Sequence, residues 1–161
     1  DIWLLFAPIK KNRTNFIIEK ATEMGAARII PVKTDFTNSE RIKRENLHAH
    51  AVEAAEQCRG TFVPVVEKLT DLNEILDAWP KNRGILYCDE SLSGTKVEKP
   101  NTHFSSWAIL VGPEGGFSSK EQAFLNNHKQ TFPISLGPRI LRADTAVVAA
   151  LTFWQNNFGD W

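Results

Sequence analysis

Short, uninterrupted apolar runs alternate with helical patterns along the whole of this 161-residue chain. Continuous apolar runs are typical of strands that lie in a parallel sheet covered by helices on both faces. Their alternation with helices therefore predicts an α/β fold with a mostly parallel sheet flanked by helices. The sequence contains no internal repeat and no linker, so we expect one domain. We expect strands at 2–6, 28–32, 84–88, 107–111 and 132–136, and a short extended piece at 63–66.

Helix ends are marked by capping signals. Capping-box spacing, a Ser, Thr or Asp followed three residues later by Glu, begins at Thr37, Asp71 and Ser118. Gly25 stands where a C-terminal glycine would end a helix over 11–24. The last expected helix, 144–157, has almost no polar face, which is typical of a central core helix or a subunit interface; we favour the interface. A polar loop is expected over 91–103.

The composition excludes several classes of protein. Nineteen Lys and Arg balance nineteen Asp and Glu, so the chain is not a nucleic-acid binder that relies on bulk positive charge. Cys58 and Cys88 are too few for a disulfide framework and favour a reducing, cytoplasmic location. No apolar run reaches the roughly 20 residues that span a bilayer. His48 and His50 are two apart on an expected helix and diverge, so we expect no metal.

Two unusual loops follow predicted strands, at 112–117 and at 135–146. Ligands of open α/β sheets bind at the carboxyl ends of the strands. Gly112, Gly115 and Gly116 permit a close approach to the backbone, although a tight turn without any ligand is about equally compatible with them. There is no GxGxxG and no Gly-Lys-Ser/Thr, which disfavours a nucleotide held by its phosphates.

The second loop carries Arg139, Arg142 and Asp144 between a strand end and a helix start. Planar, permanently charged guanidinium groups suit phosphate or nucleobase contacts. A simpler interpretation makes Asp144 the helix N-cap, which its position favours, and pairs the arginines with Asp144 or Glu114 at the surface.

Together these loops resemble the ribosomal RNA small subunit methyltransferase E family of the SPOUT superfamily. The resemblance rests on Leu110–Phe117 (LVGPEGGF) and on Ser135–Ala146 (SLGPRILRADTA). Three further segments agree in order along the chain: 19–25 (EKATEMG), 53–58 (EAAEQC) and 158–161 (FGDW).

The resemblance implies an enzyme that uses S-adenosylmethionine to methylate N3 of a uridine in 16S rRNA of the small ribosomal subunit. It implies a C-terminal trefoil knot formed by the two loops, and a homodimer. It also implies that residues 1–161 are the catalytic domain alone, without the N-terminal PUA-like RNA-binding domain of full-length members. The cofactor would be held mainly by backbone groups of Leu110, Gly112, Gly116, Leu136, Gly137 and Leu141.

Uracil N3–H must lose its proton before or during methyl transfer, so a base or an anion-stabilising cation would help. We hypothesise that Arg142 pairs with a uracil carbonyl oxygen, and that Asp144 or Glu114 assists the proton loss. The RNA contacts that we expect come from two helices and the second loop: Arg13, Lys20, Glu23, Gln57, Arg59 and Arg139.

Three other functions stay open. The first is that of a methyltransferase of the same superfamily that acts on another RNA such as tRNA. The second is that of a non-catalytic RNA-binding or assembly module. A generic nucleotide-binding α/β domain ranks last, because no phosphate motif is present.

Overall fold

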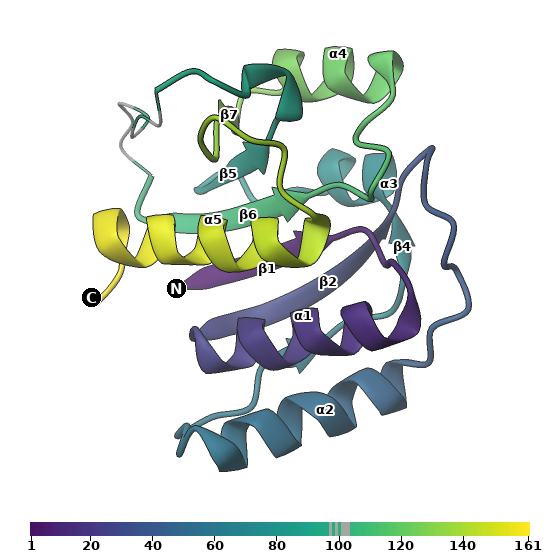
Figure 1. The fold of residues 1–161 in the computed structure, drawn as a ribbon, viewed down its shortest axis with the longest axis vertical. Helices are drawn as coiled ribbons and strands as arrows, with labels where there is room; N and C mark the ends of the chain where they lie inside the picture. The colour runs from purple at the N-terminus through teal and green to yellow at the C-terminus, as the bar shows by residue number, and fades with distance from the viewer. Residues whose placement is uncertain (97, 99, 101–103) are drawn as a thin grey trace.

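The computed structural model has a parallel sheet at its centre (Figure 1). It describes residues 1–96, 98, 100 and 104–161, so the expected loop over 91–103 lies partly outside the described residues. Within them the sheet has seven strands in the order β3-β2-β1-β6-β5-β7, and β4 pairs with β2 beside this path. Every pairing is parallel, which confirms the predicted fold class. The strands are β1 (Ile2–Phe6), β2 (Ala26–Lys33), β3 (Val65–Val66), β4 (Thr70–Asp71), β5 (Arg83–Cys88), β6 (Ser106–Val111) and β7 (Thr131–Ile134).

Helices cover both faces of the sheet, and two separate apolar clusters result. Successive strand residues point to opposite faces, so Leu4 and Phe6 belong to one cluster and Leu5 to the other. The first face is covered by α1 (Lys11–Glu23), α2 (Arg44–Gln57) and α5 (Ala143–Phe158), and the second by α3 (Leu72–Asp77) and α4 (Ser119–Asn127). No helix in the described part of the chain is both long and apolar enough to cross a membrane.

Most of the predicted helix ends are confirmed. Gly25 follows α1 with φ +82°, Ser118 caps α4 in a complete capping box with Glu121, and Asp71 caps α3. The capping box at Thr37 is wrong, because α2 begins only at Arg44. The Thr37 hydroxyl instead accepts the backbone N–H of Thr34 at 2.9 Å and closes a local turn.

Helix α5 lies against α1 and β6. Its N-cap is Arg142, so the interpretation of Asp144 as the N-cap is wrong. Most of its apolar residues are buried within this chain: Ala143, Ala146, Val147, Ala150, Leu151 and Trp154. Val148, Ala149 and Phe153 remain half-buried on the less covered side of the helix. The helix therefore contributes to the core and also keeps some incompletely covered apolar surface.

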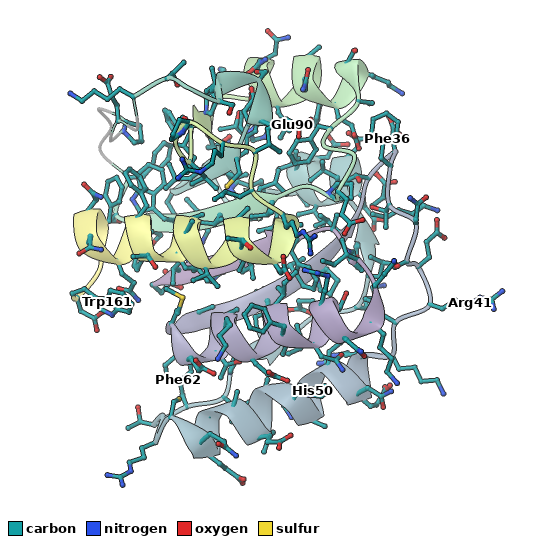
Figure 2. The ribbon with its side chains drawn as sticks, viewed as in Figure 1. Phe36, Arg41, His50, Phe62, Glu90 and Trp161 are labelled. Atoms are coloured by element: carbon teal, nitrogen blue, oxygen red, sulfur yellow. The ribbon has the colours of Figure 1, made fainter. Side chains whose placement is uncertain are left out.

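Several large apolar side chains are exposed. Figure 2 shows Phe62 and Trp161 projecting outward, near the ends of α2 and of the chain, while Phe36 lies in the loop after β2. Ile140, at 70% exposure, is more open than any of these and belongs to the loop between β7 and α5.

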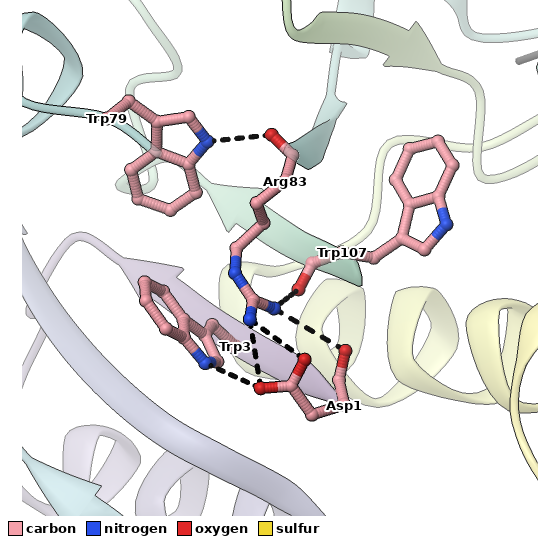
Figure 3. Close-up of polar contacts among 5 residues, drawn as sticks. All are labelled: Asp1, Trp3, Trp79, Arg83 and Trp107. Carbon is pink, nitrogen blue, oxygen red and sulfur yellow. Dashed lines mark hydrogen bonds and ion pairs between the residues drawn. The ribbon is translucent and has the colours of Figure 1, made fainter. Parts of the chain in front are cut away.

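A buried arginine ties the start of β1 to β5 and β6 (Figure 3). The Arg83 guanidinium donates to the Trp107 carbonyl at 2.7 Å and to the two carboxylate oxygens of Asp1 at 2.8 and 2.9 Å. It also stacks over the Trp3 ring, 3.8 Å from the centroid. Burial, and secondarily the charge of Arg28, lower the pKa of Arg83 to about 10.

We expect Arg83→Met to lower the free energy of unfolding by about 2 kcal/mol, because the buried Trp107 carbonyl would lose its donor. Urea denaturation followed by tryptophan fluorescence measures this change. Arg28→Met is the control: Arg28 also lies over Trp3, but its ion pair with Glu67 is well exposed, so we expect a loss below about 1 kcal/mol. Equal losses for the two variants would contradict this account of Arg83.

Candidate functional site

The carboxyl ends of β1, β5, β6 and β7 meet at one edge of the sheet, and a cavity of about 430 Å³ opens there. Its walls come from the segments that follow these four strands. This is the position at which parallel α/β sheets bind their ligands, and the volume lies in the usual range of small-molecule sites.

The glycine-rich turn after β6 forms one wall. The Gly116 N–H donates to the Pro113 carbonyl at 2.9 Å, and Gly116 has φ +69°, a conformation that L side chains rarely adopt. A Cβ added at Gly116 would come within 2.6 Å of Oε1 of Glu90, and one at Gly112 within 3.1 Å of the Phe117 ring. Of the three glycines in this turn, only Gly116 has a positive φ.

A second glycine turn, after β7, forms the facing wall. Gly137 has φ +109°, its N–H donates to Oγ of Ser135 at 3.2 Å, and its carbonyl accepts the N–H of Gly94 at 3.1 Å. A Cβ built on Gly137 would meet nothing within 4 Å, and the residue lines the cavity. The backbone of Gly137 is therefore fixed by its neighbours, while open space lies beside its α-carbon.

The structure brings five of the six predicted cofactor residues to this cavity: Gly112, Gly116, Leu136, Gly137 and Leu141. Leu110 is fully buried in β6 and does not line it. The trefoil knot stays a prediction.

Exposed charges surround the mouth of the cavity. Glu114, Arg139 and Arg142 line it, and among the described residues none of the three makes an ion pair or a side-chain hydrogen bond. The expected surface pairing of these arginines is thus not found. Asp144 pairs instead with Arg13 of α1, with Oδ2 and Nη1 2.5 Å apart. Arg13, whose side chain is 35% exposed, also lines the cavity.

The other predicted RNA-contact residues lie away from the cavity. Lys20 and Glu23 pair with each other at 2.6 Å, and Lys20 lies about 10 Å further along α1 than Arg13. Gln57 and Arg59 lie at the far end of α2, where Arg59 adopts φ +57° and Gly60 N–H bonds to the Ala55 carbonyl. Arg59 therefore helps to terminate the helix, in a position that glycine usually occupies.

The sequence analysis missed the segment after β5. Asp89 and Glu90 line the cavity, and the Glu90 carboxylate lies against Gly116. They follow the predicted strand at 84–88, so the carboxyl-edge rule applied to every strand would have found them. Other lining residues that were missed are Lys10, Ser93, Gln122 and Ile140. In the described part of the chain, no three His, Cys, Asp or Glu side chains are grouped as metal ligands.

Cys88 also lines the cavity, but burial raises the pKa of its thiol to about 12. Because the thiolate is the reactive form, we expect Cys88 to react with Ellman's reagent at least about 100-fold more slowly than the exposed Cys58. Thiol titration of the native chain should show one fast equivalent, which Cys58→Ser removes. Two equivalents that react at the same rate would contradict the assignment of Cys88 as a half-buried, protonated thiol.

Comparisons with known proteins agree with this arrangement. The model of a family described as an RNA methyltransferase domain matches residues 1–155. The chain is 34% identical to ribosomal RNA small subunit methyltransferase E of Rickettsia conorii and 32% identical to that of Buchnera aphidicola subsp. Schizaphis graminum. These alignments cover 92% and 94% of this chain but 61% and 63% of the relatives, so the chain spans about three fifths of their length.

A solved structure is similar over the whole chain. It is ribosomal RNA small subunit methyltransferase E from Neisseria gonorrhoeae bound to S-adenosyl methionine, with a TM-score of 0.87 and 26% identity. The match covers 100% of this chain and 68% of that one.

Proposed function

Because this chain belongs to the RNA methyltransferase domain family, with relatives of the small subunit methyltransferase E type, we propose that it methylates N3 of a uridine in 16S rRNA. S-Adenosylmethionine is the proposed methyl donor. One observation carries the proposal: a cavity walled by glycine turns lies at the carboxyl edge of the sheet, bordered by two arginines, Arg139 and Arg142, that have no ion pair within the described residues.

The residues of the cavity fit such a cofactor. S-Adenosylmethionine has no phosphate, so it needs no P-loop lysine, and its adenine suits the apolar surface of Leu136 and Leu141. The two turns at Gly116 and Gly137 let a ligand approach the backbone closely. When bound, the cofactor supplies an electrophilic methyl group on a sulfonium. We assign its binding to backbone groups of Gly112, Gly116, Leu136, Gly137 and Leu141. Leu110 is buried in β6, so we assign it a packing role instead.

The charges at the mouth suit the uridine. Arg142 is exposed and unpaired within the described residues, so its guanidinium is free to stabilise the uracil anion through a carbonyl oxygen. Glu114 is likewise free to take the N3 proton. Asp144 is already bound to Arg13, so we give it the role of holding Arg13 toward the RNA rather than that of the base.

N3 lies on the Watson–Crick edge, so the target uridine must be unpaired or flipped out to reach the cavity. We place Arg139 and Arg13 against the RNA at the mouth. Lys20, Glu23, Gln57 and Arg59 would make only outlying contacts, because none of them lines the cavity.

We further propose that the enzyme acts in the cytoplasm, where the small ribosomal subunit is its partner, and that it is a homodimer. The half-buried apolar residues on the less covered side of α5, Val148, Ala149 and Phe153, support a second copy on that side. Analytical ultracentrifugation at micromolar concentration should give a dimer, whereas a clean 18.1 kDa species would refute it.

Calorimetric titration tests the cofactor assignment directly. S-Adenosylmethionine and S-adenosylhomocysteine should each bind one site per chain, and S-adenosylhomocysteine should raise the melting temperature. ATP at the same concentrations is the control and should not bind, because the chain has no phosphate-binding motif. A folded chain that binds neither adenosyl compound would refute the proposed function.

A further inference from the structure

A second hollow, of about 860 Å³, lies between the starts of α1 and α2 and the loop that precedes α2. We call it the α1–α2 groove. Its lining residues are Ile9, Lys11, Thr14, Asn15, the loop residues 37–43, and Asn46 and Leu47 of α2. The proposed methyl-transfer chemistry uses none of them.

The groove concentrates positive charge in a chain whose net charge is zero. Lys11, Arg41 and Lys43 are exposed, and none has an ion pair or side-chain hydrogen bond within the described residues. Figure 2 shows Arg41 extending outward from the loop before α2. The acidic residue in the lining, Glu40, is already paired with Lys33 at 3.0 Å. The lining therefore carries three cations against one carboxylate, an excess of positive charge that favours an anionic ligand.

The neutral lining also suits a nucleic-acid backbone. Asn15, Asn38, Ser39 and Asn46 have no side-chain hydrogen bonds in the described structure, so their amides and hydroxyl are free to bond phosphate oxygens and ribose hydroxyls. Ile9 and Leu47 are buried and form an apolar floor. Among the described residues, no aromatic side chain lines the groove, so they offer no platform for base stacking there.

The groove and the cavity share a wall, which is the first turn of α1. Lys10 and Arg13 line the cavity, whereas Lys11, Thr14 and Asn15 line the groove. A nucleic-acid strand that leaves the cavity across this turn passes Lys10 and Lys11 in succession and then enters the groove.

We propose that the α1–α2 groove binds the ribose–phosphate backbone of the single-stranded RNA segment that flanks the target uridine. This inference rests on the proposed function, and it adds where the substrate strand runs. Recognition is through phosphate and ribose, so it does not depend on the bases bound there.

Fluorescence anisotropy of a short, labelled single-stranded RNA containing one uridine tests the groove. The triple variant Lys11→Gln/Arg41→Gln/Lys43→Gln should bind this RNA about tenfold more weakly than the native chain. Its plot of log affinity against log salt, between about 50 and 200 mM, should be shallower by about 2, since three phosphate contacts are lost. The matched control, Lys68→Gln/Lys81→Gln/Lys129→Gln, removes the same charge from exposed lysines that line neither hollow, and should behave as the native chain.

Three results would overturn the inference. They are no measurable RNA binding by the native chain, equal losses in the two triple variants, and equal displacement of the RNA by a polyglutamate peptide, which would make the groove a site for acidic proteins. Titration with S-adenosylmethionine separates this inference from the proposed function. Both triple variants should keep native cofactor affinity, and a native chain that fails to bind the cofactor refutes the function whatever the groove does.

Discussion

Arg142→Ala should lower the kcat of methyl transfer by about 100- to 1000-fold while leaving the affinity for S-adenosylmethionine almost unchanged. The loss is this large because Arg142 is assigned to the charge that develops on the uracil ring, whereas the other arginines at the mouth, Arg139 and Arg13, are assigned to RNA contact. Its effect on folding should be small, since the side chain is exposed and makes no capping hydrogen bond, although the residue is the N-cap of α5. Single-turnover transfer from a radiolabelled cofactor, with calorimetry of the same variant, measures the two quantities.

Arg28→Ala is the control for Arg142. Arg28 is a partly exposed arginine at the opposite end of the sheet, paired with Glu67, so turnover should stay native. Arg139→Ala should act differently from both, by raising KM for RNA more than it lowers kcat, because Arg139 is assigned to substrate contact. Equal loss of turnover and cofactor affinity in Arg142→Ala would contradict the role of this residue.

Gly137→Ala should weaken S-adenosylmethionine binding by about tenfold to a hundredfold. The added methyl group meets no protein atom within 4 Å, so it would occupy space in the cavity that the cofactor is assigned to fill. Alanine at φ +109° also strains the backbone, which costs stability as well.

Gly25→Ala separates these two effects. Gly25, just after α1, has a similar φ of +82°, and its added Cβ would meet its nearest neighbour, Nε2 of Gln155, at an ordinary contact distance of 3.4 Å, but it does not line the cavity. Both variants should therefore lose a similar part of the unfolding free energy, and only Gly137→Ala should lose cofactor affinity. Similar cofactor affinities in the two variants would place the cofactor elsewhere.

Much of the fold follows from local patterns. The five longer strands and the ends of α1, α3 and α4 were predictable because apolar runs, Gly25, Asp71 and Ser118 act through neighbouring residues, whereas the two-residue strand β4 was not predicted. The capping box predicted at Thr37 does not form, because the Thr37 hydroxyl accepts the backbone N–H of Thr34, three residues upstream. This contact is as local as the predicted cap and competes with it.

The site was predictable in position but not in its pairings. The carboxyl-edge rule brings the loops after β6 and β7 together, as the cavity shows. The partner of Asp144 is Arg13, 131 residues away, and only the packing of α1 against α5 brings them together. Arg13 and Lys20 are seven residues apart and share one face of α1, but two turns of helix carry Lys20 away from the cavity that Arg13 lines.

Mass spectrometry of nucleosides from 16S rRNA, after deletion of the gene that encodes this chain, tests the proposed methylation at N3. One 3-methyluridine per 16S rRNA should disappear on deletion, return when the native gene is restored, and not return with the Arg142→Ala gene. An unchanged level of 3-methyluridine in the deletion strain would contradict it.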